Sequence, residues 1–251
     1  MGKVDFESGR YWDDPHNVFT GYSPVSEPGD PCLHGWATGF ANRLGGDFTP
    51  TFHADRLEAI LGKRRPRIFF CNNTSDWMRP DFPDGMIRQF LLSLEDAPEH
   101  AYLTLTKRLR RLVDIYDSEI GDLEIPNLWL GATVWDQASA EAALELLSLI
   151  PEHIWISYEP MLGGLELGEL WYGIEWCTLG AETGVGHRVA DPEWFASAIE
   201  QCAHRRIPVW IKAFPLPGGG ITHKLSEMPP WARVRQLPPE LEAILKPKGA
   251  E

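Results

Sequence analysis

The recurrence of short, uninterrupted apolar runs constrains the fold of this chain more than any other feature. The runs are rich in β-branched and aromatic residues, and their apolar residues follow one another instead of alternating with polar ones. This pattern is typical of strands that are buried on both faces of a parallel sheet. Six runs predict strands: Arg67–Cys71, Ala101–Leu105, Asn127–Thr133, His153–Tyr158, Glu175–Leu179 and Pro208–Ile211. Val18–Tyr22 is a candidate seventh strand at the N-terminal edge.

Helical patterns lie between these runs. Apolar residues recur every three or four positions in 86–94, 109–116, 143–150 and 194–202, which is the spacing of one helix face. The last pattern has a strong helix start, because Asp191 can accept a hydrogen bond at the N-cap and Pro192 follows where a missing N–H costs nothing. Cys202 falls on the apolar face of this helix, so we expect it in the core.

Strands that alternate with helices predict right-handed βαβ units and one parallel sheet. A closed eight-stranded barrel needs more repeats than the sequence offers, so we expect an α/β fold with an incomplete TIM-like (β/α) barrel. Chains of this length, 251 residues, commonly form such a fold as one domain. We therefore expect a single domain over 1–251, with an irregular N-terminal segment (1–50). A C-terminal tail (215–251) would pack on the barrel and end in a helix near Pro239–Leu245.

Composition and charge narrow the class of protein. No apolar run reaches the ~18 residues of a membrane span, and the first residues lack the apolar region of a signal peptide, so we expect a cytoplasmic protein. The four cysteines are far apart, which favours free thiols over a disulfide framework. The net charge of −13 argues against non-specific binding of duplex nucleic acid. The local basic clusters at 63–67, 107–111 and 205–206 are either solvated flanks or a phosphate-contacting rim.

Polar residues follow one predicted strand after another. In parallel α/β folds, ligands bind at the carboxyl ends of the strands. The strand ends carry Asn72, Asn73, Ser75, Asp76, Trp77, Lys107, Trp135, Asp136, Glu159, Glu182, Gly184 and Lys212. Structural alternatives stay open, since Asp76 could cap a helix, Glu159 could be a turn residue and Lys212 could pair with a neighbouring carboxylate. The glycine-rich segment Gly180–Gly186 is either a tight loop or a cradle of backbone N–H groups for an anion.

Seven short segments occur in an order and spacing that match one family. They are Phe70–Asp76, Leu103–Arg108, Asn127–Val134 with Asp136-Gln137, Ser157–Gly163, Gly180–Gly184, Asp191–Trp194 and Gln201-Cys202. On these segments the chain resembles a phage-associated, radical-SAM-like family of unknown function, over roughly residues 18 to 215. The resemblance implies a radical-SAM-like barrel core, and the host cytoplasm as location if the protein is phage-encoded.

The three-cysteine motif of that family is incomplete in this sequence. Such a motif holds three irons of a four-iron cluster and leaves the fourth iron for S-adenosylmethionine. At the matching positions Tyr22 and Gly35 replace two cysteines, and only Cys32 remains. One thiolate cannot replace three, so we expect neither the usual iron–sulfur cluster nor S-adenosylmethionine as a cofactor. The alternative candidate ligands are Cys32, His34 and Cys71, a set that suits zinc or an unusual iron site.

The strand-end motifs remain although the cluster motif is lost, which predicts a retained binding site for a polar ligand. The candidate acid–base or nucleophilic residues are Asp76, Glu159 and Glu182. Lys212 is the candidate for stabilising a developing anion. The candidate stacking surface for a planar base is Trp36, Trp77 and Trp135. The other strand-end residues named above are candidates for substrate binding.

These assignments favour a phage-type enzyme that modifies a nucleobase or nucleotide. Base exchange or glycosidic chemistry fits the carboxylates, so the enzyme would be a transferase or glycosidase-like, and its substrate a nucleobase, a nucleotide or DNA. Two alternatives stay open. One is a radical-SAM enzyme with an altered cluster, and the other is a non-catalytic binding or partner protein.

Overall fold

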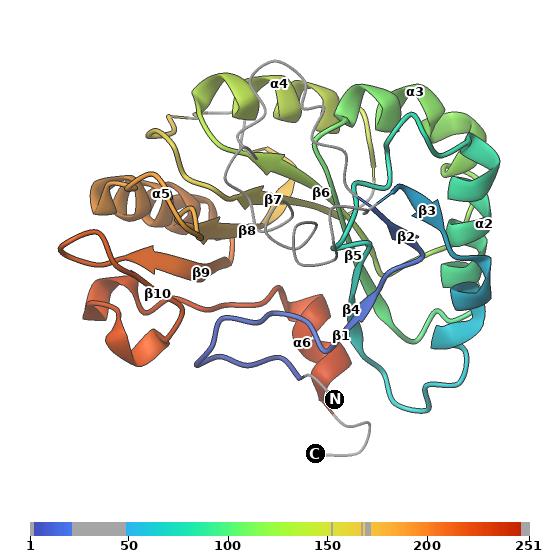
Figure 1. Cartoon of the computed structure of the whole chain (residues 1–251), viewed down its shortest axis with the longest axis horizontal. Coiled ribbons are helices and arrows are strands. Elements are labelled where there is room, and N and C mark those ends of the chain that lie inside the picture. Colours follow the sequence, from blue (N-terminus) through green and yellow to red (C-terminus); the bar gives the residue numbers. More distant parts are fainter. Residues whose placement is uncertain (1–2, 22–48, 152, 167, 169–171, 247–251) are drawn as a thin grey trace.

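Eight strands form one central sheet in an α/β fold (Figure 1). The computed structural model describes residues 3–21, 49–151, 153–166, 168 and 172–246. In sheet order the strands are β1 (Asp14–His16), β4 (Ile68–Cys71), β5 (Ala101–Thr106), β6 (Leu128–Val134), β7 (His153–Tyr158), β8 (Ile174–Gly180), β9 (Val209–Pro215) and β10 (Ile221–Thr222). Neighbours from β1 to β9 are parallel, and β10 is antiparallel to β9. The six strands predicted from apolar runs are confirmed.

The prediction that Val18–Tyr22 forms the edge of the central sheet is wrong. Within Val18–Tyr22, the strand β2 (Phe19–Thr20) pairs with β3 (Thr51–Phe52) in a separate two-stranded sheet, and Tyr22 lies outside the described residues. The edge of the central sheet is β1 instead, which contains Pro15 and has no apolar run. Proline is tolerated there because an edge strand leaves one row of N–H groups unpaired. An ion pair of 2.7 Å between Arg67 and Asp14 also ties β1 to the start of β4.

The predicted helices are present and surround the strands. The long helices are α2 (Asp84–Glu95), α3 (Leu109–Glu119), α4 (Gln137–Leu147) and α5 (Pro192–Arg205), and they form an arc around the sheet in Figure 1. Asp191 caps α5 by accepting a hydrogen bond of 2.9 Å from the Glu193 N–H, and Cys202 is buried, both as predicted. The terminal helix α6 is Pro239–Leu245, and 3₁₀ turns cover Ala54–Ile60 (η2), Leu225–Glu227 (η4) and Pro230–Ala232 (η5).

Within the described ranges, every helix is too short or too polar to cross a membrane.

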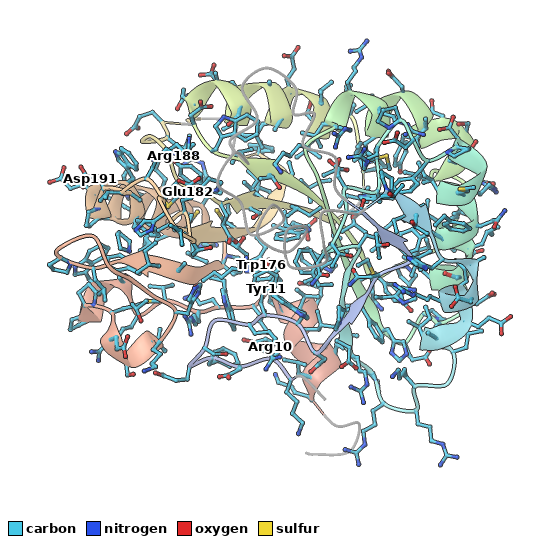
Figure 2. The ribbon with its side chains drawn as sticks, in the orientation of Figure 1. Arg10, Tyr11, Trp176, Glu182, Arg188 and Asp191 are labelled. Atoms are coloured by element: carbon cyan, nitrogen blue, oxygen red, sulfur yellow. The ribbon has the colours of Figure 1, made fainter. Side chains whose placement is uncertain are left out.

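The two faces of the sheet bury different side chains, because successive residues of a strand point to opposite sides. Residues on the outer face pack against α2 to α5. The inner face carries an indole layer, which consists of Trp129, Trp155, Trp176 and Trp210. Tyr11 joins this layer from the N-terminal segment, with its ring 5.1 Å from that of Trp176 (Figure 2).

Both ends of the chain hold the indole layer in place. The Trp210 Nε1–H donates to the Gly9 carbonyl at 2.9 Å, and the Trp176 Nε1–H donates to the Gln236 carbonyl at 3.0 Å. The α6 side chain Leu241 is fully buried in the same cluster. Residues 3–13 form neither a helix nor a strand, yet they supply Tyr11 to the buried inner face.

The inner face becomes polar toward the carboxyl ends of the strands. Ser157, Thr178 and Lys212 each lie two residues after a tryptophan of the indole layer, namely Trp155, Trp176 and Trp210, and so point to the same face. On β6 the residue beyond Trp129 is Gly131, where a Cβ atom would lie 2.4 Å from Trp155 Nε1, and Thr133 follows it. The alternation of the strands thus places a polar layer directly above the indole layer.

Candidate active site

A polar row crosses four neighbouring strands at this edge of the sheet, and we define it as Lys107, Thr133, Ser157 and Thr178. Thr133 is paired in register with Ser157, and Ser157 with Thr178. Lys107 follows β5, whose last residue is paired with the residue before Thr133. Because paired residues of parallel strands face the same side, the four side chains lie next to one another.

Glu159 lies at the centre of the polar groups. Its Oε1 accepts hydrogen bonds from Thr178 Oγ1 at 3.0 Å and from Ser157 Oγ at 3.3 Å. Its Oε2 is 2.8 Å from Lys212 Nζ, and the carboxylate is largely buried while the ammonium is about one-third exposed. Lys212 therefore pairs with a neighbouring carboxylate, which was one of its two predicted roles. Glu159 is that partner, and it also accepts hydrogen bonds from two hydroxyl groups.

Gly180 leaves the space that the Glu159 carboxylate occupies. A Cβ atom on Gly180 would lie 2.9 Å from Glu159 Oε2 and 3.1 Å from its Cδ. The Glu159–Pro160 peptide bond is cis. The loop that follows is joined to both neighbours, because Met161 N–H donates to the Gly180 carbonyl and Leu162 N–H donates to the Trp135 carbonyl, each at 2.9 Å. Trp135 and Glu159 are thus held at the same edge.

Tyr11 lies beneath Glu159. Burial and then the charge of Glu159 raise the pKa of Tyr11 well above its usual value, and the neighbouring Thr178 hydroxyl opposes this rise. The phenol is therefore neutral and able to donate. Thr178 lies two residues beyond Trp176 on the same face and donates to Glu159, which pairs with Lys212, so polar and charged groups extend from the indole layer to Lys212.

Asp76 does not join this group. Its Oδ1 accepts from Thr106 Oγ1 at 2.7 Å and from the Met78 N–H at 3.0 Å. Its Oδ2 accepts from the Lys107 N–H at 3.1 Å and pairs with Arg108 at 2.7 Å. Asp76 follows β4, which is three positions from β7 in the sheet, and it joins the loop after β4 to the loop after β5.

Glu182 is buried and fully engaged by one arginine. Arg188 donates from Nε at 2.8 Å and from its backbone N–H at 2.7 Å to Oε2, and from Nη2 at 2.5 Å to Oε1 (Figure 2). Gly184 has a φ of +111°, which lets the segment between them turn back. Glu182 follows β8, next to β7, so its loop borders the group around Glu159.

The residues after β4 have structural contacts that the sequence did not show. Asn72 is buried with a φ of +56°, and its Oδ1 accepts from the Val18 and Phe19 N–H groups, so it fixes the N-terminal segment. The stacking role predicted for Trp77 is wrong, because Trp77 is fully buried and packs on Phe90.

Asn73 and Ser75, in the same loop as Asn72, can still bind a substrate. Asn73 Oδ1 and Ser75 Oγ are buried and have no hydrogen-bond partner within the described ranges. Both remain candidates for substrate contact.

Asp136 is a helix cap. Its Oδ1 accepts from the Ser139 N–H at 2.9 Å, and Ser139 Oγ accepts from the Asp136 N–H at 3.0 Å. This reciprocal pair is a capping box, so the structure gives Asp136 a role in starting α4. Its carboxylate is used by the helix and not by the polar row.

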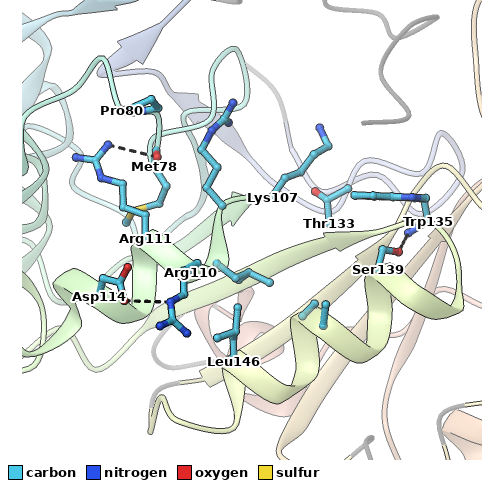
Figure 3. A pocket seen from close by; sticks show the side chains of 14 residues that line it. Met78, Pro80, Lys107, Arg110, Arg111, Asp114, Thr133, Trp135, Ser139 and Leu146 are labelled. Atoms are coloured by element: carbon cyan, nitrogen blue, oxygen red, sulfur yellow. Dashed lines mark hydrogen bonds and ion pairs between the residues drawn. The ribbon is translucent and has the colours of Figure 1, made fainter. Parts of the chain in front are cut away.

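A pocket of about 540 Å³ opens between α3 and α4, next to the polar row (Figure 3). Its polar rim and its apolar floor are formed by Lys107, Arg108, Arg110, Arg111, Asp114, Thr133, Trp135, Ser139, Met78, Pro80, Leu109, Ala142, Ala143 and Leu146. Lys107 and Trp135 were predicted binding residues and are brought together here. Thr133, Ser157 and Thr178 were missed, although their signal was present as polar residues two positions from a glycine or tryptophan within a strand.

Of the three candidate metal ligands, only Cys71 lies in the described part of the chain. Cys71 lies in the core cluster of the outer face, and burial raises the pKa of its thiol far above the usual value, so it stays protonated. Cys32, His34 and Trp36 lie outside the described residues. Among those that are described, no three His, Cys, Asp or Glu side chains form a metal-binding group.

The comparisons place the whole site within one family. The sequence profile of a family described as "Protein of unknown function (DUF5131)" matches residues 8–232. Comparison with curated proteins and with solved structures gave no significant match. The matched range includes Tyr11, the polar row, Glu159 and Lys212, and so covers every residue of the site.

Proposed function

Since the chain belongs to this family of proteins of unknown function, we propose from the geometry of its site that it is an enzyme acting on a nucleobase or nucleotide. The observation that carries the proposal is the Glu159–Lys212 pair, which lies at the carboxyl ends of β7 and β9 and is backed by two hydroxyl groups. Contacts from Thr178, Ser157 and Lys212 hold this largely buried carboxylate in one orientation, which is what a nucleophile or general base requires.

The same proposal includes the form of the sheet. We take it to be an incomplete (β/α) barrel with a radical-SAM-like core. Seven parallel strands in sequential order and an outer arc of helices support it, as does an inner face filled by layers of side chains. The phage origin and the cytoplasmic setting rest on the resemblance and the composition alone.

In base exchange, the Glu159 carboxylate would form a bond to the anomeric carbon of a nucleoside while the bond to the base nitrogen breaks. The electron pair stays on that nitrogen, which takes a proton from the Lys212 ammonium. An incoming base then attacks the same carbon, releases Glu159 and returns a proton to Lys212. If water attacks instead, the reaction is a glycosidic hydrolysis.

The test is turnover by three variants. The wild-type protein is incubated with nucleosides and nucleotides in the presence of isotopically labelled free bases, and labelled product or released base is followed by mass spectrometry. We expect Glu159→Gln to lose about 10²–10⁴-fold in rate and Lys212→Met to lose a comparable factor. The matched control is Glu175→Gln, a β8 carboxylate that pairs with His153 at 2.7 Å. Full activity in Glu159→Gln would refute the proposal.

One observation favours a non-catalytic binding protein as the second candidate. Asp76 and Glu182 have their oxygens occupied by arginine and backbone donors, so two of the three carboxylates predicted to be catalytic act as structural links. Binding of a nucleotide without turnover of any tested compound, in the wild-type protein, distinguishes this candidate from the enzyme.

A further inference from the structure

Thr133 differs from the other serine and threonine residues of strands β5 to β8. The other four, Thr104, Thr106, Ser157 and Thr178, each donate a hydrogen bond of 2.7–3.3 Å. The Thr133 hydroxyl has no hydrogen-bond partner within the part of the chain that the structure describes, although the residue is only 9% exposed. An unpaired hydroxyl in a nearly buried place is unfavourable, so a polar ligand group that pairs with it gains affinity.

The position of Thr133 connects this hydroxyl to the Glu159 site. Thr133 is in register with Ser157, whose Oγ is 3.3 Å from Glu159 Oε1. Neighbouring strands are about 4.8 Å apart, and paired residues face the same side. A ligand that reaches Glu159 at the carboxyl edge of the sheet can therefore also reach the Thr133 hydroxyl.

Trp135 lies beside Glu159 at the next step along the same two strands. The last paired residues of β6 and β7 are Val134 and Tyr158, and Trp135 and Glu159 follow them directly. The Leu162 N–H, from the loop after Glu159, donates to the Trp135 carbonyl at 2.9 Å. This bond keeps the indole next to whatever is bound at Glu159.

The Trp135 ring is available for stacking. It is half-buried and does not belong to the indole layer. Rings of that layer pack on one another, as Trp155 and Trp176 do at 5.3 Å, whereas Trp135 has no aromatic contact within the described ranges. In Figure 3 the Thr133 and Trp135 side chains lie next to each other at the end of β6. An indole face with an unpaired hydroxyl beside it fits a flat ring that has a polar edge.

We propose that Trp135 and Thr133 form the subsite for the base of the substrate, with the base stacked on the indole and its polar edge hydrogen-bonded to the Thr133 hydroxyl. That the ring is a nucleobase rests on the proposed function, whereas the fit to a flat ring with a polar edge rests on the geometry alone. A hydroxyl both donates and accepts, so Thr133 would determine which base is preferred, and Trp135 would hold any of them.

The experiment measures binding by calorimetry with the common free nucleobases and their nucleosides. At least one base should bind to the wild type. Thr133→Val, which removes the hydroxyl and keeps the shape, should weaken binding of the preferred base about 2–10-fold and reduce the difference between bases, while Thr133→Ser should stay within about twofold of the wild type. Trp135→Leu should weaken binding of every base about fivefold or more, and Trp135→Phe should restore most of the loss. Urea midpoints show whether each variant is folded.

Two controls separate this inference from the proposed activity. Thr51→Val makes the same substitution at an exposed residue of β3, outside the central sheet, and should bind as the wild type does. Glu159→Gln should keep the affinity for the free base while losing turnover. The inference is overturned if no base binds, or if Thr133→Val or Trp135→Leu binds as the wild type does, even when Glu159→Gln is inactive. Weakened binding in both variants together with full activity in Glu159→Gln would support the subsite and overturn the catalytic role.

Discussion

Replacing Gly131 by alanine should destabilise the protein strongly, because the β6 backbone touches the indole layer at this point. An added Cβ would lie 2.4 Å from Trp155 Nε1 and 2.7 Å from the Thr104 carbonyl oxygen, far inside ordinary contact distance. The same carbonyl accepts the Trp155 Nε1–H at 3.1 Å. The indole cannot give way without leaving this buried hydrogen bond.

The magnitude follows from two costs. Overpacking a close-packed core costs about 1–3 kcal/mol, and an unpaired buried donor costs about 1–3 kcal/mol. We therefore expect the free energy of unfolding to fall by roughly 2–6 kcal/mol. For a chain of this size, at about 2–4 °C per kcal/mol, the melting temperature should fall by about 4–24 °C.

Urea denaturation followed by tryptophan fluorescence measures this change, and calorimetry gives the melting temperature. Gly85→Ala is the matched control, since Gly85 lies in α2 and a Cβ there meets nothing within 4 Å. That variant should gain about 0.5–1 kcal/mol from helix propensity. If Gly131→Ala is as stable as the wild type, the indole layer is not packed as described.

Three further predictions concern charge and pH. Burial lowers the pKa of His16 from 6.5 to about 4. The folded protein should therefore lose about 3 kcal/mol of stability as pH falls from 6.5 toward 4, because the unfolded chain takes up a proton at His16 and the folded one does not. In His16→Gln the urea midpoint should change less over that pH range. Both His187 ring nitrogens contact carbonyl groups, those of Gly184 at 2.9 Å and Gly219 at 3.0 Å, which needs a doubly protonated ring and raises its pKa. The contact between the two loops should therefore be complete below pH 6.5 and lost as pH rises through the raised pKa, and NMR titration of His187 should show a value above 6.5. Asp76→Asn should lower stability by about 1–3 kcal/mol, because Arg108 and the Lys107 N–H lose a charged acceptor; an unchanged urea midpoint would contradict its role as a link.

Apolar runs predicted the strands well because strands buried on both faces leave a strong signal in the sequence. β1 gave no such signal. Its three residues include Pro15, and it is a strand only because it pairs with β4. Tyr11 was missed for the same reason, since nothing local in 3–13 shows that this segment enters the core.

The site was predicted in part. The ends of parallel strands predicted where Glu159 and Lys212 would lie, but spacing along a chain does not reveal which side chains meet. Trp77 illustrates this limit, because an aromatic residue after a strand can turn either into the core or toward a ligand. The capping role of Asp136 could have been predicted, since Asp directly before a helical pattern is a preferred N-cap residue.

The contact between Gly9 and Trp210 can form only late in the synthesis of the chain on the ribosome. The two residues are 201 positions apart in the chain, and a ribosome adding about 5–20 residues per second needs roughly 10–40 s to make the second after the first. During that interval Tyr11 has no finished indole layer to enter. Until β9 is synthesised, the N-terminal segment cannot pack in its final place, and the Tyr11 side chain stays exposed. A chaperone that binds this segment until β9 emerges should therefore raise the yield of folded protein.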